Sequence, residues 1–64
     1  MPLVQVSLRE GREPEKLRAL ISALTTAVAD TIDAPLDSIR VVLTEVPSTH
    51  WAAGNVTLAE RDQS

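Results

Sequence analysis

The most reactive group in this sequence is the proline that follows the initiator methionine, Pro2. Methionine is removed efficiently when the next residue is small, so we expect Pro2 to become a secondary amine that can act as a base or a nucleophile. An unperturbed α-amino group titrates near ~8, and apolar burial with nearby cations favours the neutral form. Arg12, Arg40 and Trp51 are the residues that could supply these influences. The alternative is that Pro2 only begins a strand.

Other catalytic residue types are scarce. The chain contains no Cys, no Tyr and a single His, so it predicts neither a disulfide framework nor a Cys/His zinc site. His50 has no partner at metal-ligand spacing, and we expect it to be exposed or to cap an interface. Ser48 and Thr49 follow Pro47 and are typical turn formers.

The first element that must position Pro2 is a strand at about 2–8. Val4, Val6 and Leu8 alternate with other residues, which is the period of a half-buried strand. Gly11 breaks this pattern because it tolerates positive φ.

A long helix is predicted at about 14–33. Pro14 suits its first turn, and Pro35 biases the preceding residue away from helical geometry. Between them, apolar residues recur at steps of three and four and form one stripe. The stripe consists of Leu17, Leu20, Ile21, Leu24, Val28 and Ile32.

Two further elements follow the helix. The segment at about 39–46 is rich in β-branched residues and predicts a second strand, which a right-handed crossover would place parallel to the first. Gly54 and Asn55 favour a tight turn in a short hairpin at about 51–58, and the tail from Glu60 is polar.

Length and composition predict one domain, 1–64, that needs partners. A compact monomer of 6.9 kDa would still expose ~4,000 Å², which leaves little burial for stability. Two strands and one helix also leave an apolar sheet face and edge uncovered. We therefore expect an obligate oligomer.

Charge and hydropathy exclude other functions. The net charge of -3, the six Lys+Arg and the single aromatic residue offer no basic stripe and no stacking platform for nucleic acid. No apolar run approaches the ~20 residues of a membrane span, and no secretory leader is recognisable at the N-terminus. We expect a cytoplasmic protein with no membrane partner.

Five short features occur in a characteristic order and spacing: Pro2 directly after Met1, the Glu10-Gly11-Arg12 turn, the Asp33-Ala34-Pro35-Leu36 stop, the Ile39-Arg40-Val41 start of a strand, and Trp51. In these features, over nearly its whole length, the chain resembles the 4-oxalocrotonate tautomerase family of the tautomerase superfamily. The resemblance implies an α/β (α+β) fold, a β-α-β protomer of the tautomerase/MIF-like type with a short C-terminal hairpin. It also implies an oligomer, most simply a homohexamer.

The activity implied by the resemblance is a cofactor-independent isomerisation without a metal. The N-terminal Pro2 would be the general base that ketonises 2-hydroxydienoates, such as 2-hydroxymuconate, to α,β-unsaturated ketones. Substrates would be small conjugated (di)carboxylates or keto-enols, as in the degradation of aromatic rings, although a biosynthetic pathway is also compatible.

By position in the family pattern, Arg40 would bind the 2-hydroxy oxygen and adjacent carboxylate, and Arg12 the distal carboxylate. Trp51 would wall the pocket, and several subunits would contribute to each site. Fixed guanidinium groups suit the negative charge that develops in such a reaction. The alternatives are a solvated turn position for Arg12, a salt bridge from Arg40 to Glu45 or Asp37, and an interface anchor for Trp51.

Arg9 departs from the family pattern, which has an apolar residue there. Paired arginines at 9 and 12 are similar to the carboxylate-binding pair of the related 3-chloroacrylic acid dehalogenases, but Ala53 stands where those enzymes have a water-activating acid. The alternatives are therefore a hydratase or dehalogenase of short unsaturated acids, with Arg9 binding substrate, or a non-catalytic subunit of a hetero-oligomer. Arg9 could equally be a surface charge.

Overall fold

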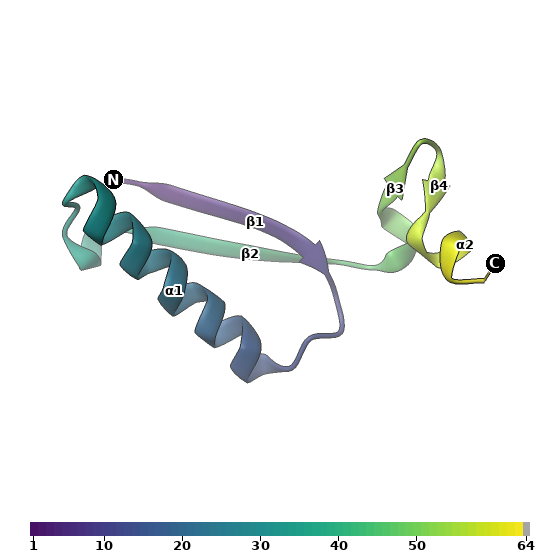
Figure 1. Ribbon diagram of the computed structural model, residues 1–64, viewed down its shortest axis with the longest axis horizontal. Helices are drawn as coiled ribbons and strands as arrows, with labels where there is room; N and C mark the ends of the chain where they lie inside the picture. Colours follow the sequence, from purple (N-terminus) through teal and green to yellow (C-terminus); the bar gives the residue numbers. More distant parts are fainter. Residues whose placement is uncertain (64) are drawn as a thin grey trace.

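Two parallel strands and one long helix form the larger part of the computed structural model, which describes residues 1–63 (Figure 1). The strands are β1 (Leu3–Arg9) and β2 (Arg40–Val46), and the helix between them is α1 (Pro14–Ile32). This order confirms the predicted β-α-β unit. Leu3 pairs with Arg40 at one end of the ladder, and Arg9 pairs with Val46 at the other.

The helix covers one face of this sheet. Val4, Val6 and Leu8 are half-buried, whereas the residues between them are exposed, as the alternation predicted. Five of the six apolar residues of the helical stripe are half-buried, but Ile32 in the last turn is 60% exposed although it fits the spacing of the stripe. Helix α1 contacts β2.

The ends of α1 follow from local chemistry. Pro14 occupies the first turn, where its missing N–H costs no helical hydrogen bond. At the other end Asp33 adopts the left-handed conformation with φ 58 and terminates the helix one residue before the predicted end. A short 3-10 helix, η1 (Leu36–Ser38), then leads into β2.

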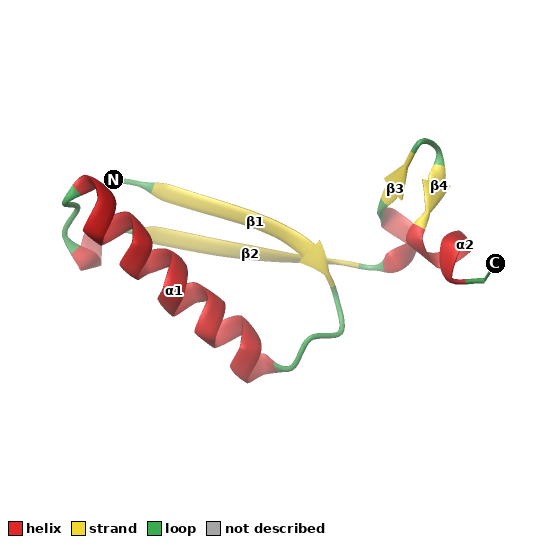
Figure 2. Ribbon diagram, viewed as in Figure 1, coloured by secondary structure: helices red, strands yellow, loops and turns green. Residues whose placement is uncertain are grey.

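The C-terminal segment begins with the 3-10 helix η2 (Ser48–His50) and continues as a hairpin of β3 (Ala52–Ala53) and β4 (Val56–Thr57) (Figure 2). The predicted turn lies at Gly54 and Asn55, whose φ values of 59 and 68 are those of a type I′ turn. The hairpin is shorter than predicted because a helix that the sequence did not predict, α2 (Leu58–Asp62), follows it directly.

The single protomer buries very little. Among residues 1–63, Ile39 is the only apolar residue that is almost fully buried, with 8% of its surface exposed. The sheet face opposite α1 presents Leu3 and Val42, which are 57% and 45% exposed. The radius of gyration is 15.0 Å, whereas a compact chain of this length has about 11 Å. These features favour the expected partner subunits.

The accessible surface agrees with this shape, because its 4800 Å² exceeds the ~4,000 Å² of a compact monomer. Among the helices of residues 1–63, none is long and apolar enough to cross a membrane.

Candidate active site

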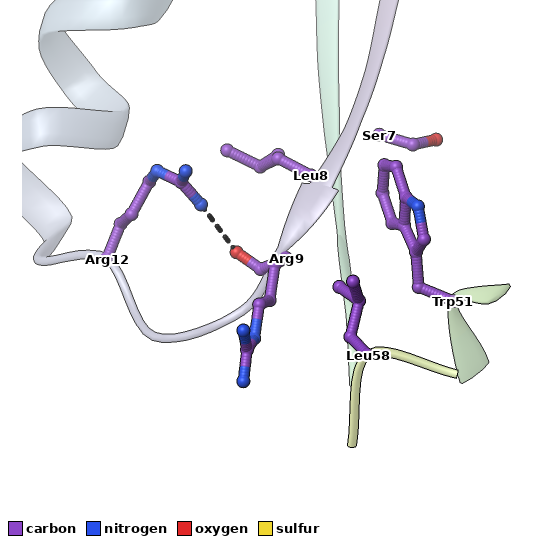
Figure 3. A pocket seen from close by; sticks show the side chains of 6 residues that line it. All are labelled: Ser7, Leu8, Arg9, Arg12, Trp51 and Leu58. Atoms are coloured by element: carbon purple, nitrogen blue, oxygen red, sulfur yellow. Dashed lines mark hydrogen bonds between the residues drawn. The ribbon is translucent and has the colours of Figure 1, made fainter. Parts of the chain in front are cut away.

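A pocket of ≈ 350 Å³ lies at the carboxyl end of β1 (Figure 3). Such a volume is at the lower end of the range for small-molecule sites. The end of the strand, the loop before α1, the residue after η2 and the first residue of α2 all contribute to it. Its lining residues are Ser7, Leu8, Arg9, Arg12, Trp51 and Leu58.

Arg12 reaches the pocket because the chain turns sharply after β1. Gly11 has a φ of 115, a conformation that residues with a side chain rarely adopt. The Arg12 Nη1 group donates a hydrogen bond of 2.8 Å to the carbonyl oxygen of Arg9. This bond uses one of five guanidinium N–H groups and holds the cation against the end of the strand. Arg12 is thus exposed, as its alternative supposed, but it also lines the pocket.

Arg9 lies between Arg12 and the C-terminal segment, and its side chain extends away from Arg12 (Figure 3). Its Nη2 group forms an ion pair with the Oδ2 atom of Asp62. The two side chains are about half exposed, so water screens the pair.

Trp51 and Leu58 form an apolar wall of the pocket (Figure 3). The backbone brings them together, because the Leu58 N–H donates to the Trp51 carbonyl oxygen at 2.9 Å. The neighbouring His50 is exposed, its Nδ1 atom lies 3.1 Å from the Thr49 hydroxyl, and it does not line the pocket.

Pro2 and Arg40 lie at the opposite end of the sheet. The Arg40 backbone N–H donates to the Pro2 carbonyl oxygen at 3.0 Å. The Arg40 Nη1 group donates to the backbone carbonyl of Asp37 at 2.9 Å. Among residues 1–63, Arg40 forms no salt bridge with the carboxylate of Asp37 or Glu45, so that alternative is wrong. Its guanidinium group is bonded to a backbone oxygen instead.

One protomer does not bring all the predicted site residues together. Arg9, Arg12 and Trp51 share the pocket, but Pro2 and Arg40 are a whole strand away. From Leu3 to Arg9 the strand spans roughly 20 Å at its usual rise per residue. A substrate of six or so carbons cannot reach both groups within one chain.

Ser7, Leu8 and Leu58, which line the pocket, and Asp62, which pairs with Arg9, were not predicted as site residues. The first two follow from the strand that ends at Arg9. The signal for the other two is the spacing Thr57-x-x-Glu60, which is the pattern of a capping box at a helix N-terminus. Within the part of the chain that the structure describes, no three His, Asp or Glu side chains are grouped as metal ligands.

Similarity to known proteins assigns the chain to a family. The family model described as tautomerase enzyme matches residues 2–61. The chain belongs to the 4-oxalocrotonate tautomerase family. It is 50% identical over 56 residues to a probable tautomerase of Ralstonia nicotianae, covering 88% of this chain and 80% of that protein. It is 41% identical over 54 residues to the 2-hydroxymuconate tautomerase of Stutzerimonas stutzeri, covering 84% and 86%.

Solved structures of the 4-oxalocrotonate tautomerase family share the fold. A homologue from the tomaymycin biosynthetic pathway, TomN, superposes with a TM-score of 0.95 at 41% identity and covers 98% of this chain and 97% of TomN. The heterohexamer 4-oxalocrotonate tautomerase of Chloroflexus aurantiacus superposes with a TM-score of 0.89 at 40% identity, covering 94% and 97%. The protein is accordingly an isomerase with tautomerase activity.

Proposed function

We propose that this tautomerase ketonises 2-hydroxydienoates such as 2-hydroxymuconate, with Pro2 as the general base. The observation that supports this most is the pocket itself, which combines two guanidinium groups with an indole wall. A relative that is 41% identical is named for 2-hydroxymuconate. A substrate with two carboxylates offers an anionic group to each of two separated cations.

The proposed reaction moves one proton and leaves the oxidation state of the substrate unchanged. The neutral Pro2 amine removes the proton of the 2-hydroxyl group, and the O–H electron pair becomes part of the new carbonyl. The double bonds shift along the conjugated chain, and Pro2 returns the proton to a carbon further along it. Arg40 binds the 2-oxygen with its adjacent carboxylate, and Arg12 binds the distal carboxylate and draws electron density toward it. Trp51 keeps the site dry, which strengthens these charge interactions.

The site requires more than one protomer, because Pro2 and the pocket lie at opposite ends of β1. In a dimer with a two-fold axis across the strands, each amino end meets the carboxyl end of its partner. The exposed face around Leu3 and Val42 offers a second surface for assembly. We propose a homo-oligomer, most simply a homohexamer, with no cofactor or metal.

Hydration or dehalogenation is the weaker alternative. Arg9 does share the pocket with Arg12, as that alternative requires. However, none of the described pocket residues is a carboxylate that could activate water, and Ala53 lies in strand β3 with only a methyl group.

The test is the rate of 2-hydroxymuconate ketonisation, followed by ultraviolet absorbance, for wild type and Pro2→Ala. An intact mass must first show that Met1 has been removed from both proteins. Loss of a general base costs about 10²–10⁴-fold in rate, and we expect kcat of Pro2→Ala to fall within that range. Equal rates for the two processed proteins would exclude Pro2 as the base.

A further inference from the structure

We propose that Asp62 is a positioning residue that sets the charge preference of the pocket through Arg9. The inference rests on the proposed function only in assuming that the pocket receives an anionic substrate. Arg9 and Arg12 both line the pocket, so together they bring two positive charges to it. The Asp62 carboxylate pairs with Arg9 and reduces this to one net charge.

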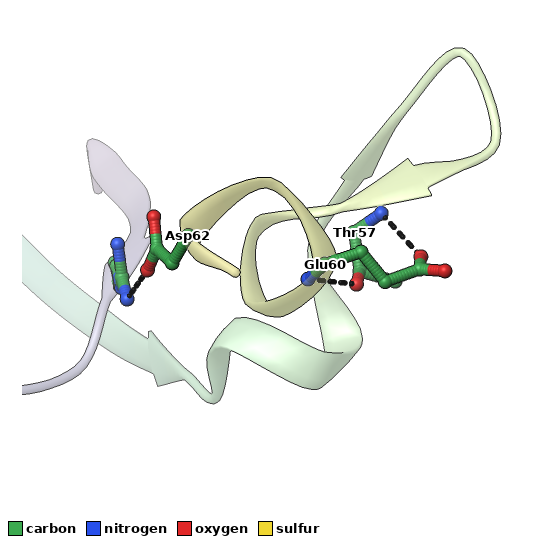
Figure 4. Close-up of polar contacts among 4 residues, drawn as sticks. Thr57, Glu60 and Asp62 are labelled. Carbon is green, nitrogen blue, oxygen red and sulfur yellow. Dashed lines mark hydrogen bonds and ion pairs between the residues drawn. The ribbon is translucent and has the colours of Figure 1, made fainter. Parts of the chain in front are cut away.

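The placement of Asp62 depends on α2 (Figure 4). The Thr57 N–H donates to the Glu60 carboxylate at 2.9 Å, and the Glu60 N–H donates to the Thr57 hydroxyl at 3.1 Å. This reciprocal capping box fixes the start of the helix. Leu58 and Asp62 are four residues apart and therefore share one face of α2. Leu58 lines the pocket, and Asp62 pairs with Arg9.

The ion pair determines where the Arg9 guanidinium lies. It is directed toward α2 and away from Arg12, which is held by its own bond to the Arg9 carbonyl (Figure 3). Without the Asp62 charge, the Arg9 side chain gains the freedom to turn toward a bound anion. A dianionic ligand benefits more from the second cation than a monoanionic one. Asp62 therefore reduces the advantage that a ligand with two charges has over one with a single charge.

Binding of two matched probes measures this preference without turnover. Adipate and hexanoate have the same chain length but two carboxylates and one, and the emission of Trp51, the single tryptophan, reports occupancy of the pocket. We expect Asp62→Asn to bind adipate about three- to fivefold more tightly and hexanoate less than twofold more tightly, because a half-exposed ion pair is worth little. The control is Asp30→Asn on α1, which changes the net charge equally and does not pair with Arg9.

A double variant shows whether Asp62 acts through Arg9. In the Arg9→Leu background, Asp62→Asn is expected to leave the ratio of the adipate and hexanoate dissociation constants unchanged, whereas Asp62→Glu in wild type keeps that ratio near its native value. An equal change of the ratio in both backgrounds, or in Asp30→Asn, would overturn the proposal. These binding constants are measured without turnover and do not test Pro2 as a base. A failure of the Pro2→Ala rate test would therefore be separate from a failure here.

Discussion

The two ends of the β1–β2 ladder differ in what they offer to catalysis. The amino end holds Pro2 and Arg40, which are joined by a backbone hydrogen bond. The carboxyl end holds the pocket with Arg9, Arg12 and Trp51. One end therefore has the candidate base without the pocket, and the other has the pocket without the base.

Parallel strands explain this division. The crossover through α1 returns the chain to the end of the sheet where β1 begins. Both strands therefore start at the same end and finish at the opposite end. The segments that follow the two strands therefore lie at the carboxyl ends of the strands (Figure 1). Arg12 belongs to the segment after β1, and Trp51 belongs to the segment after β2. Pro2, which precedes β1, lies at the amino end. A protomer of this topology therefore needs another subunit to complete the proposed site.

The largest expected effect comes from mixing two inactive variants. Pro2→Ala and Arg12→Ala are each expected to lose about 100-fold or more in activity when expressed alone. When the two variants are co-expressed with different tags and purified as mixed oligomers, about one quarter of the wild-type activity should return. Random assembly leaves both Pro2 and Arg12 native in about one quarter of the sites. The measurement is ultraviolet ketonisation of 2-hydroxymuconate.

A mixture of separately purified homo-oligomers, combined without subunit exchange, is the control and should stay inactive. Activity that fails to return in the mixed oligomers would place Pro2 and Arg12 of one site in the same chain. That result would contradict the division of the proposed site between the two ends of the ladder.

A smaller effect is expected from charge on the open sheet face. Val42 lies in the middle of β2, half-exposed and opposite Gln5. If this face packs against other protomers, Val42→Lys buries an unpaired charge, and the oligomer should dissociate. Activity should then fall about tenfold or more, because the base and the pocket no longer meet. Light scattering coupled to size-exclusion chromatography measures the assembly.

Ser22→Lys on the exposed face of α1 adds the same charge and is the control. A full-size, fully active Val42→Lys oligomer would show that this face is not an interface. Wild type that stays monomeric and inactive when expressed alone would favour the hetero-oligomer alternative.

The β-α-β unit was predictable because its signals are local and repeated. Alternation marked β1, the three-and-four spacing marked α1, and Gly54 with Asn55 marked the hairpin turn. Ile32 fits the spacing of the stripe, but the structure leaves it exposed at the helix end. A periodic pattern shows which residues share a face, but it does not show what covers that face.

The candidate site was only partly predictable. Arg12 and Trp51 were expected at a pocket, and the structure places both there. The pairing of Arg9 with Asp62 joins residues 53 positions apart, and no local spacing reveals such a contact. It depends on the short helix α2, whose five residues are too few to show a periodic pattern.

The smallest expected effect is an acid-dependent loosening of the carboxyl end. The pKa of Glu60 is lowered from its usual 4.5. The main cause is the hydrogen bond that the Thr57 backbone N–H donates to the Glu60 carboxylate, and the Thr57 hydroxyl is the smaller cause. A carboxylate with a lowered folded-state pKa stabilises α2 above its unfolded pKa, and the stabilisation is lost as the pH falls through the folded value. Acidification below pH 4.5, the usual pKa of this carboxyl group, should therefore loosen α2 and the pocket wall at Leu58. The amide proton shift of Thr57, followed by NMR, should titrate across this window.

Two backbone amides distinguish the two ends of the ladder under the same titration. The Arg40 amide, bonded to the Pro2 carbonyl at the amino end, should keep its shift because no carboxylate accepts its proton. In Glu60→Gln the Thr57 amide should lose its titration, since the side-chain amide accepts a hydrogen bond without ionising. In Asp62→Asn the titration should persist, because Thr57 bonds to Glu60 and not to Asp62. A Thr57 shift that follows Asp62 instead would assign the acid response of α2 to the ion pair with Arg9 and not to the capping box.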